Sequence, residues 1–361
     1  MSANPLASDL DHVLTHTEKL WEDLRGKRLF LTGGTGFFGC WLLESFAWAG
    51  DALNLGAEAL VLTRDPAAFA AKCPHLAAHP AIKFCQGDVR SFAFPEGKFS
   101  HVLHGATEAS ASLNRDDPLG MIDTVTQGTR RTLEFARLCG AERFLMTSSG
   151  AVYGAQPPDL SHVPEEYIGA PDCARPASAY GEGKRLAELF CAVYAEKYGL
   201  TVNIARGFAF VGPYLPLDQH FAVGNFLRDG LRGRPIQIGG DGTPSRSYLY
   251  AADLAVWLWT ILLRGRPGRA YNVGSDEART IAQTAQAVAD QFSPAPPVQI
   301  ARTPKAGQAS DRYVPSVERA RTELGLDVWT GLDAALRRTI AWNRLEWNRL
   351  EWNGKAGGQA A

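Results

Sequence analysis

Residues 27–50 predict a strand, a tight turn and a helix, in that order. An apolar run at 29–31 is typical of a parallel strand that is covered on both faces. Gly33, Gly36 and Gly39 follow it at three-residue spacing, and apolar residues at helical spacing come next. Glycine at such a turn lets a pyrophosphate approach the backbone, and the helix N-terminus offers that pyrophosphate free N–H groups. Because the glycines lie between a strand and a helix, the pattern predicts a dinucleotide-binding site.

The composition sets broad limits on partners and location. The chain has 361 residues, enough for a full core, and its formal net charge of −1 argues against nucleic acid or an anionic membrane as the main partner. Its six cysteines form no C-x-x-C pair, so neither a zinc cluster nor a redox motif is indicated. The N-terminus lacks a basic flank before an apolar stretch, and no apolar run approaches the ~20 residues that span a bilayer. We therefore expect a cytoplasmic protein with free thiols, no membrane segment and no metal site.

Apolar strand-like runs alternate with helical stretches from the glycine turn to about residue 200. Strands are expected at 59–63, 82–84, 101–104 and 143–147, and a helix at 121–139. This alternation predicts an α/β fold, a Rossmann-type doubly wound parallel sheet with helices on both faces. We assign residues 27–200 to this dinucleotide-binding domain.

The remaining segments differ from this domain in composition. Residues 1–26 are expected to form an amphipathic helical extension that serves packing. Residues 201–340 have loops rich in Gly, Pro and aromatic residues, which predicts a smaller substrate lobe interleaved with the last strands of the sheet. Residues 341–361 contain the repeat WNRLE, and a step of five residues turns a helix by about 140°, so its Trp side chains cannot share a face. We expect this tail to be disordered.

Tyr180 and Lys184 are four residues apart, which places both on one face of a helix. A phenol is a poor base at neutral pH because its pKa is about 10, and a nearby ammonium favours the phenolate. Such a tyrosine can take a proton from a sugar or alcohol hydroxyl while a hydride leaves for a nicotinamide. Ser149 ends an expected strand, where its hydroxyl could bind the same oxygen. The spacing alone also fits an ordinary surface helix; the combination with the glycine turn and the serine favours an active site.

Several further motifs occur in a fixed order along the chain. They are TGGTGFFG at 32–39, GDV at 87–89, HGAT at 104–107, SSGAVYG at 148–154, ARGFAFVGP at 205–213, GDGTPSRSYLYAADLA at 240–255 and YNVGS at 271–275. Together with the Tyr–Lys pair, this set resembles the extended short-chain dehydrogenase/reductase family, specifically its nucleotide-sugar epimerases and dehydratases. The resemblance covers residues 27 to about 325.

The resemblance implies a role for individual residues. The catalytic group would be Ser149, Tyr180 and Lys184. The cofactor would be bound by residues from the first half of the chain and by the catalytic pair, namely Gly33, Gly36, Phe37, Phe38, Gly39, Arg64, Asp88, Val89, Ala106, Tyr180 and Lys184. The diphosphate of the substrate would be bound by Arg246, with Arg312 as a second ligand, because guanidinium groups suit phosphate oxygens. The family also implies a homodimer built on the 121–139 helix and the Tyr180 helix, with a nucleotide-diphosphate sugar as substrate.

The identity of the dinucleotide depends on the turn after the second strand. An acidic residue there would accept the ribose hydroxyls and mark NAD. Thr63, Arg64 and Asp65 stand there instead, and Arg64 could pair with the 2′-phosphate of NADP, whereas Asp65 could bend back to the ribose. We predict NAD, and Arg64 leaves NADP open.

Departures from the family pattern bear on the type of reaction. Sugar 4,6-dehydratases commonly have Asp-Glu after the catalytic hydroxyl, and decarboxylating relatives usually keep the Glu, whereas this chain has Gly150 and Ala151. Neither residue can exchange a proton, so elimination is disfavoured. The sequence therefore predicts a nucleotide-sugar 4-epimerase. The alternatives are a 4,6-dehydratase, an NAD(P)H-dependent 4-keto-sugar reductase, or a catalytically silent dinucleotide sensor, which the intact catalytic group disfavours.

Overall fold

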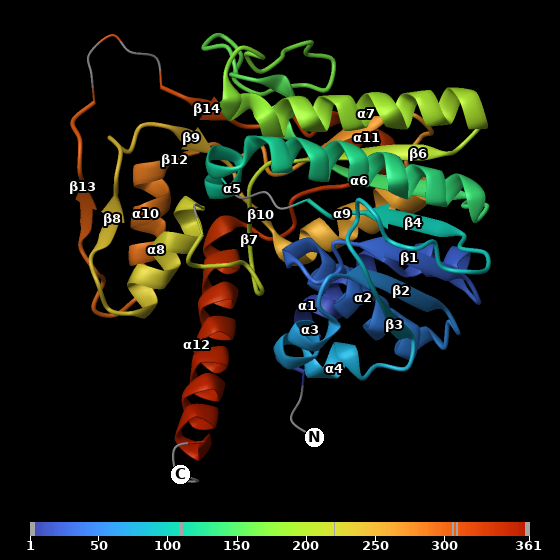
Figure 1. Ribbon diagram of the computed structural model, residues 1–361. Helices are drawn as coiled ribbons and strands as arrows, with labels where there is room; N and C mark the ends of the chain where they lie inside the picture. Colours follow the sequence, from blue (N-terminus) through green and yellow to red (C-terminus); the bar gives the residue numbers. More distant parts are fainter. Residues whose placement is uncertain (1–3, 108–110, 220, 305–306, 308–309, 358–361) are drawn as a thin grey trace.

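The protein is described by a computed structural model that covers residues 4–107, 111–219, 221–304, 307 and 310–357. Its centre is a seven-stranded sheet in the order β11–β6–β5–β4–β1–β2–β3, in which every pair of neighbours is parallel (Figure 1). The strands are β1 (Arg28–Thr32), β2 (Glu58–Thr63), β3 (Ile82–Gln86), β4 (His101–His104), β5 (Arg143–Ser149), β6 (Val202–Gly207) and β11 (Ala270–Val273). The expected parallel sheet is thus confirmed.

Helices cover both faces of this sheet because successive strand residues point to opposite faces. Leu29 and Leu31 of β1 join the core on the side of α2 (Phe37–Leu53) and α9 (Ala251–Arg264). Phe30 joins the opposite core, on the side of α6 (Pro118–Leu138) and α7 (Ala179–Tyr198). Figure 1 shows α6 and α7 running together along their side of the sheet. This is the doubly wound arrangement that the alternating pattern predicted.

The smaller elements complete the order of the chain. Between the sheet strands lie α3 (Pro66–Lys72), α4 (Pro74–Ala77), α5 (Ala111–Asp116), η2 (Gly150–Tyr153) and η3 (Pro176–Ser178). Beyond β6 lie β7 (Phe210–Val211), α8 (Ala222–Leu231), β8 (Ile236–Ile238), β9 (Ser245–Arg246), β10 (Leu249–Tyr250), β12 (Arg279–Thr280), α10 (Ile281–Ala289), β13 (Val298–Ile300), β14 (Arg312–Tyr313), α11 (Glu318–Leu324) and α12 (Leu332–Gly357). None of the helices in the described residues is long and apolar enough to cross a membrane.

The N-terminal segment consists of α1 (Ala7–Thr17) and η1 (Glu18–Leu24), and it packs on α9. Helix α9 is buried on all sides, so it needs neighbours on every face. The buried carboxylate of Asp9 accepts hydrogen bonds from Tyr250 and Arg338, each at 2.6 Å. His12 pairs with the buried Asp253 at 2.8 Å. Polar contacts therefore join this segment to α9 and α12.

The lobe beyond β6 is assembled from very short strands. Strand β9 pairs with β12 on one side and with β14 on the other, and β8 pairs with β13. Strands β6 and β11 of the central sheet come from the same part of the chain, so the lobe and the sheet are interleaved. Because two-residue strands bury little on their own, β9 and β14 depend on each other and on the surrounding loops for their positions.

Helix α12 extends through the WNRLE repeat to Gly357, where the sequence predicted no regular structure. The first turn of the repeat is anchored by the rest of the protein. Ile340 and Asn343 are buried, and the ring centre of Trp342 lies 4.9 Å from that of Tyr214. Packing of these three side chains explains why the helix continues past residue 340.

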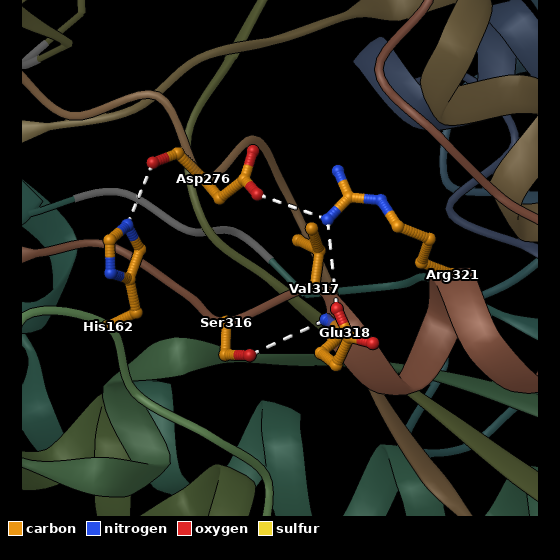
Figure 2. A pocket seen from close by; sticks show the side chains of 6 residues that line it. All are labelled: His162, Asp276, Ser316, Val317, Glu318 and Arg321. Carbon is orange, nitrogen blue, oxygen red and sulfur yellow. Dashed lines mark hydrogen bonds and ion pairs between the residues drawn. The ribbon is translucent and has the colours of Figure 1, made fainter.

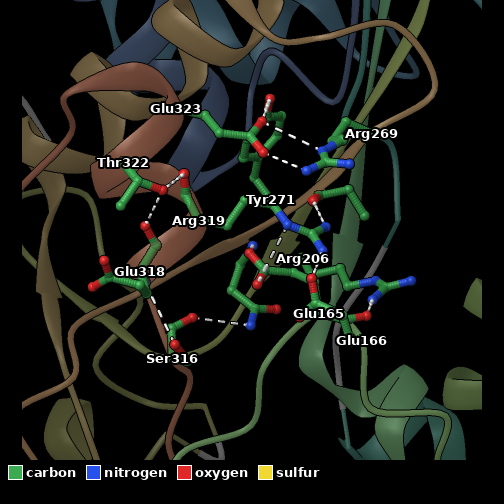
Figure 3. Close-up of polar contacts among 12 residues, drawn as sticks. Glu165, Glu166, Arg206, Arg269, Tyr271, Ser316, Glu318, Arg319, Thr322 and Glu323 are labelled. Atoms are coloured by element: carbon green, nitrogen blue, oxygen red, sulfur yellow. Dashed lines mark hydrogen bonds and ion pairs between the residues drawn. The ribbon is translucent and has the colours of Figure 1, made fainter.

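A polar network joins the edge of the sheet to α11 (Figure 3). Glu323 accepts a hydrogen bond from Tyr271 of β11 at 2.9 Å and forms an ion pair with Arg269. On the next strand, Arg206 pairs with Glu188 of α7 at 2.7 Å, and Glu188 also accepts from Ser148 at 2.5 Å. The contacts of Glu188 with Arg206 and Ser148 therefore brace the carboxyl end of β5, where Ser149 begins the candidate site.

Candidate active site

The largest cavity associated with the predicted site residues has a volume of about 710 Å³ and lies between the carboxyl ends of the strands and the lobe. Parallel strands place their carboxyl ends at one edge of the sheet, which is where ligands of such folds bind. The sheet side contributes Gly33, Gly36, Phe37, Phe38, Gly105, Thr107, Thr147, Ser148, Ser149, Ala151, Tyr180 and Lys184. The lobe side contributes Phe208, Gln219, Phe221, Arg246, Tyr248 and Tyr313, among others.

Different structural constraints explain why each of the three positions in the turn is a glycine. A Cβ on Gly33 would lie 2.4 Å from the backbone of Gly105, and its φ of +74° also disfavours a side chain. A Cβ on Gly39 would lie 2.3 Å from Gly34, so close packing explains this glycine. A Cβ on Gly36 would meet only the Gly33 carbonyl, at 3.4 Å, and Gly36 lines the cavity. Gly36 is also the N-cap of α2 and makes no side-chain cap, so this corner fits the pyrophosphate of a dinucleotide.

The residues expected on the adenosine side lie outside the cavity. Asp88 pairs with Arg90 through two hydrogen bonds of 2.8 and 2.9 Å, and this pairing lowers the pKa of Asp88 to about 2. Arg64 is close enough to Asp88 to favour its charged form. Val89 is buried against α6, and the N–H of Ala106 donates to Thr32 at 3.2 Å. The turn after β2 therefore carries both signs of charge, on Arg64 and Asp65. The carboxylate of Asp88 is already hydrogen-bonded to Arg90 in the structure.

Asp65, the alternative ribose ligand, has a local role in the structure. Its carboxylate accepts a hydrogen bond from the N–H of Ala68 at 2.9 Å and caps the N-terminus of α3. Binding of NAD or NADP therefore depends on the second carboxylate oxygen of Asp65 and on Arg64.

Ser149, Tyr180 and Lys184 meet at the floor of the cavity. Ser149 ends β5 and is buried, and its hydroxyl lies close enough to the phenol of Tyr180 to favour the charged form of that phenol. The first turn of α7 holds Tyr180, and the side chain of Asn114 accepts its N–H at 2.9 Å. Lys184 is only 2% exposed and donates to Thr107 at 2.9 Å and to the Thr147 carbonyl at 2.7 Å. The structure thus brings together the three residues that the sequence predicted as catalytic.

The protonation of this group differs from what the spacing predicted. Burial raises the pKa of Tyr180, and the nearby hydroxyl of Ser149 opposes this only in part. Lys184 lies 5.9 Å from the centre of the Tyr180 ring and directs its hydrogen bonds to Thr107 and Thr147. Burial also lowers the pKa of Lys184 to about 8. The expected lowering of the phenol pKa by the ammonium is therefore not found, because burial raises that pKa and Ser149, not Lys184, is the group that opposes the rise.

The lobe presents one arginine to the cavity rather than two. Arg246 lines the cavity, and its guanidinium donates to Asp311 at 2.7 Å. The neighbouring Arg312 lies outside the cavity, where its nearest polar partner is the Ser161 carbonyl at 3.5 Å. Neighbouring residues of a strand point to opposite faces, so Tyr313 takes the place in β14 that faces the cavity.

The sequence reasoning missed Tyr313, Phe208 and the two threonines that bind Lys184. Tyr313 hydroxyl oxygen lies 3.4 Å from Ser149 Oγ, and its ring centre lies 4.6 Å from that of Phe208. The only available signal was the alternation within the short Asp-Arg-Tyr run, which requires Arg312 and Tyr313 to face different ways. Without knowledge of the pairing partner of β14, that signal could not say which of the two faces the substrate.

A second cleft, of about 220 Å³, lies beside α11 (Figure 2). Its walls carry opposite charges that already meet each other. Arg321 lies 3.3 Å from the carboxylate of Asp276 and 3.9 Å from that of Glu318, and His162 bonds to the Asp276 carbonyl at 2.9 Å. We assign no ligand to this cleft because its charges are neutralised within it.

A doubly wound sheet with a glycine turn at its switch point, and a serine, tyrosine and lysine meeting in one cavity, defines an extended short-chain dehydrogenase/reductase. Residues 29–274 match the model of the NAD dependent epimerase/dehydratase family. The chain therefore belongs to this family.

Relatives within the family differ in their reactions. UDP-glucuronic acid decarboxylase 1 of Danio rerio is 28% identical over 316 residues, which cover 88% of this chain and 72% of that protein. UDP-glucuronic acid decarboxylase 1 of Arabidopsis thaliana is 29% identical over 315 residues, which cover 87% of this chain and 69% of that protein. These identities show common ancestry and leave the reaction open.

Solved structures with the same architecture include enzymes of two further kinds. The UDP-glucose 4-epimerase of Thermus thermophilus, in complex with NAD, is 28% identical with a TM-score of 0.71, and the match covers 88% of this chain and 99% of that chain. The dTDP-glucose 4,6-dehydratase DesIV of Streptomyces venezuelae, with NAD bound, is 26% identical with a TM-score of 0.73, and the match covers 88% and 97%.

Proposed function

We propose that this protein modifies the sugar of a nucleotide-diphosphate sugar by hydride transfer at C4, and that the reaction is a C4 epimerisation with NAD. The observation that carries the proposal is the meeting of Ser149, Tyr180 and Lys184 at the floor of a cavity whose opposite wall holds Arg246. Gly36 supports the cofactor part, because it leaves the N-terminus of α2 open to a phosphate. The NAD-bound relatives support NAD over NADP.

Each residue of the site has a role in this reaction. Tyr180 takes the proton of the sugar C4 hydroxyl and later returns it, and Ser149 hydrogen-bonds to the same oxygen. Lys184, anchored by Thr107 and Thr147, holds its ammonium beside Tyr180. Arg246 can donate two N–H groups to the diphosphate. In the structure its guanidinium donates to the carboxylate of Asp311, in the place of the diphosphate. When bound, NAD would supply reversible acceptance of a hydride at the sugar carbon, so the reaction would have no net redox change.

A UDP-glucuronic acid decarboxylase is the second candidate, and the curated relatives favour it. Oxidation at C4 makes a uronate a β-keto acid, so the same triad would start the reaction. However, the position that carries a Glu in such enzymes by family resemblance is Ala151, which lines the cavity without a proton to exchange. The lack of an acidic side chain at position 151 also disfavours the 4,6-dehydratase. A 4-keto-sugar reductase would be recognised by its consumption of NAD(P)H.

Two measurements test the proposal. Mass spectrometry of the small molecules released from the purified protein should find NAD. If NADP is found instead, the cofactor is NADP and Arg64 is the residue that pairs with its 2′-phosphate. The protein is then incubated with UDP-glucose, UDP-glucuronate and dTDP-glucose, and products are followed by proton NMR, with the Tyr180→Phe variant as control. Epimerisation at C4 in the wild type alone supports the proposal. Release of CO₂ from UDP-glucuronate would replace it with the decarboxylase, and loss of water from dTDP-glucose with the dehydratase.

We also propose that the protein forms a homodimer through α6 and α7. Helix α7 exposes an apolar stripe at helical spacing, consisting of Leu186, Leu189 and Val193, with exposed fractions of 41%, 57% and 45%. Large exposed apolar patches of this kind mark interaction surfaces. Light scattering should give twice the chain mass, and Leu189→Glu should give monomers. Leu345→Glu is the matched control, because Leu345 of α12 is 55% exposed and lies elsewhere; dissociation by this variant as well would contradict the proposed surface.

The cytoplasmic location that we expect from the sequence stays a prediction.

A further inference from the structure

Three hydroxyl groups meet in the active-site cavity, one more than the catalytic group requires. Ser149 and Tyr180 line the cavity together, with the serine hydroxyl near the phenol, and Ser149 Oγ lies 3.4 Å from the hydroxyl of Tyr313. The Tyr313 hydroxyl also lies 3.4 Å from the Gly207 carbonyl oxygen. Its ring packs against Phe208, with ring centres 4.6 Å apart. The second phenol is thus held at Ser149 from the lobe side, opposite Tyr180.

Gly150 shows that this placement shaped the sequence around the site. A Cβ at position 150 would lie 2.8 Å from the Tyr313 hydroxyl and 2.7 Å from the Phe208 ring. No side chain fits there without displacing one of these two rings. The position after Ser149 therefore lacks a side chain because Tyr313 and Phe208 occupy that space, and the group with an exchangeable proton at this point of the cavity is the phenol of Tyr313.

The number of available protons limits how the three hydroxyls can be connected. A serine hydroxyl has one proton to donate and two lone pairs to accept with. Ser149 Oγ already accepts from the N–H of Ala151 at 3.2 Å, so one lone pair remains. If Ser149 gives its proton to Tyr180, it can only accept from Tyr313. If it gives its proton to Tyr313 instead, then Tyr180 loses its donor, and Tyr313 points its own proton at Gly207.

We propose that Tyr313 is a positioning residue of this active site, which donates to Ser149 and thereby directs the Ser149 proton to the oxygen of Tyr180. The proposal deepens the proposed function and rests on it only for the naming of Tyr180 as the base. A hydrogen bond that is passed on in this way stabilises negative charge on Tyr180. In this arrangement the lobe, which also carries the substrate arginine, contributes to the ionisation of the base.

A cationic side chain lies near each of the two phenols. The guanidinium of Arg246 lies 5.8 Å from the centre of the Tyr313 ring, and Lys184 lies 5.9 Å from the centre of the Tyr180 ring. Burial raises the pKa of Tyr313, so this phenol keeps its proton and remains a donor at neutral pH. Tyr153 is another phenol near Tyr313, and its hydroxyl is engaged by Asn272 and Arg206, each at 2.8 Å.

The test reads the ionisation of Tyr180 directly, in NAD-loaded protein. The near-ultraviolet absorbance of tyrosinate is titrated with pH in the wild type and in Tyr180→Phe, and the difference isolates Tyr180. The same difference is then taken in a Tyr313→Phe background, which keeps the packed ring and removes only the hydroxyl. We expect Tyr180 to titrate about 0.5 to 1 pH unit higher without the Tyr313 hydroxyl, the size of one lost hydrogen bond. An unchanged or lower value would overturn the proposal.

Two further variants keep the test decisive. Tyr153→Phe removes a buried phenol that does not touch Ser149, so it should leave the titration of Tyr180 in place even where it lowers stability. Gly150→Ala should move the Tyr313 hydroxyl away and shift the titration in the same direction as Tyr313→Phe. No sugar is present in these measurements, so they stand even if the turnover assays assign another reaction. Where turnover is found, the acid limb of its kcat profile should shift by the same amount.

Discussion

The two walls of the active-site cavity are built in different ways. On the sheet side, Ser149, Tyr180 and Lys184 come from the adjoining elements β5 and α7, and Ser149 and Lys184 are buried. On the lobe side, Arg246 and Tyr313 come from paired two-residue strands, and the side chain of Arg246 is 28% exposed beside an Asp311 that is 61% exposed. Buried, mutually bonded groups suit proton transfer, whereas an exposed cation with an exchangeable partner suits the capture of an anion. We infer that Ser149, Tyr180 and Lys184 of the sheet wall set the rate of the reaction, and that Arg246 of the lobe wall sets its affinity for substrate.

Loss of the base should have the largest effect and should fall on rate alone. Tyr180→Phe removes the hydroxyl that exchanges a proton with the sugar, so we expect kcat to fall about a thousandfold. The ring remains, so NAD content, measured by mass spectrometry, should match the wild type. Activity within about tenfold of the wild type would show that another group is the base and would break the division between the two walls.

The glycine turn offers a second contrast, inside the sheet wall itself. Gly33→Ala should lower the free energy of unfolding by about 3 kcal/mol, because its Cβ would lie 2.4 Å from Gly105 at a positive φ. Gly36→Ala should leave that free energy within about 1 kcal/mol and weaken dinucleotide binding about tenfold or more, because its Cβ points into the cavity.

Chemical denaturation of the dinucleotide-free protein and calorimetric titration with NAD separate these two effects. Equal losses of stability in both variants would mean that Gly36, like Gly33, serves packing. The pyrophosphate site would then have to be sought elsewhere along the edge of the sheet.

A substitution in the lobe wall should change KM. Arg246→Ala removes a guanidinium that offers charge-assisted hydrogen bonds, so we expect KM for the nucleotide sugar to rise about 10- to 100-fold with kcat within about threefold. Arg312→Ala removes the same charge from the neighbouring strand, outside the cavity, and is the matched control. Equal increases in KM would restore the two-arginine assignment made from the sequence.

Local rules made the sheet wall predictable from the sequence. A strand, a glycine turn and a helix follow one another within residues 27–50, and the helical spacing of Tyr180 and Lys184 is local as well. The direction of the pKa of Tyr180 was not predictable, because it depends on burial, which follows from the packing of α7 against the core on its side of the sheet and not from residue spacing. Tyr313 was missed for a related reason. Its role depends on the pairing of β14 with β9, between residues far apart in the sequence, and on space left by Gly150.

The sheet wall should also respond to acid, because it contains a buried, neutral histidine. His104 ends β4, and its ring nitrogens lie 2.8 Å from the hydroxyl of Thr32 and 3.0 Å from that of Thr129. Burial lowers the pKa of His104 from its usual value of about 6.5 to about 3 in the folded protein. Between these values the unfolded chain binds a proton that the folded protein does not, so stability is complete above pH 6.5 and declines as the pH falls toward 3.

Near neutral pH, this decline in stability is the smallest of the effects that we expect. By pH 5 the free energy of unfolding should be about 2 kcal/mol lower than at pH 7 on account of His104. His104→Gln keeps polar atoms near both threonines and cannot take up the proton, so its unfolding free energy should vary less with pH over this interval. His101, whose pKa burial also lowers, to about 4, would supply what slope remains. If the variant kept the full slope of the wild type, the acid response would have to come from groups other than His104, and the sheet wall would lose its distinction as the more acid-sensitive side of the cavity.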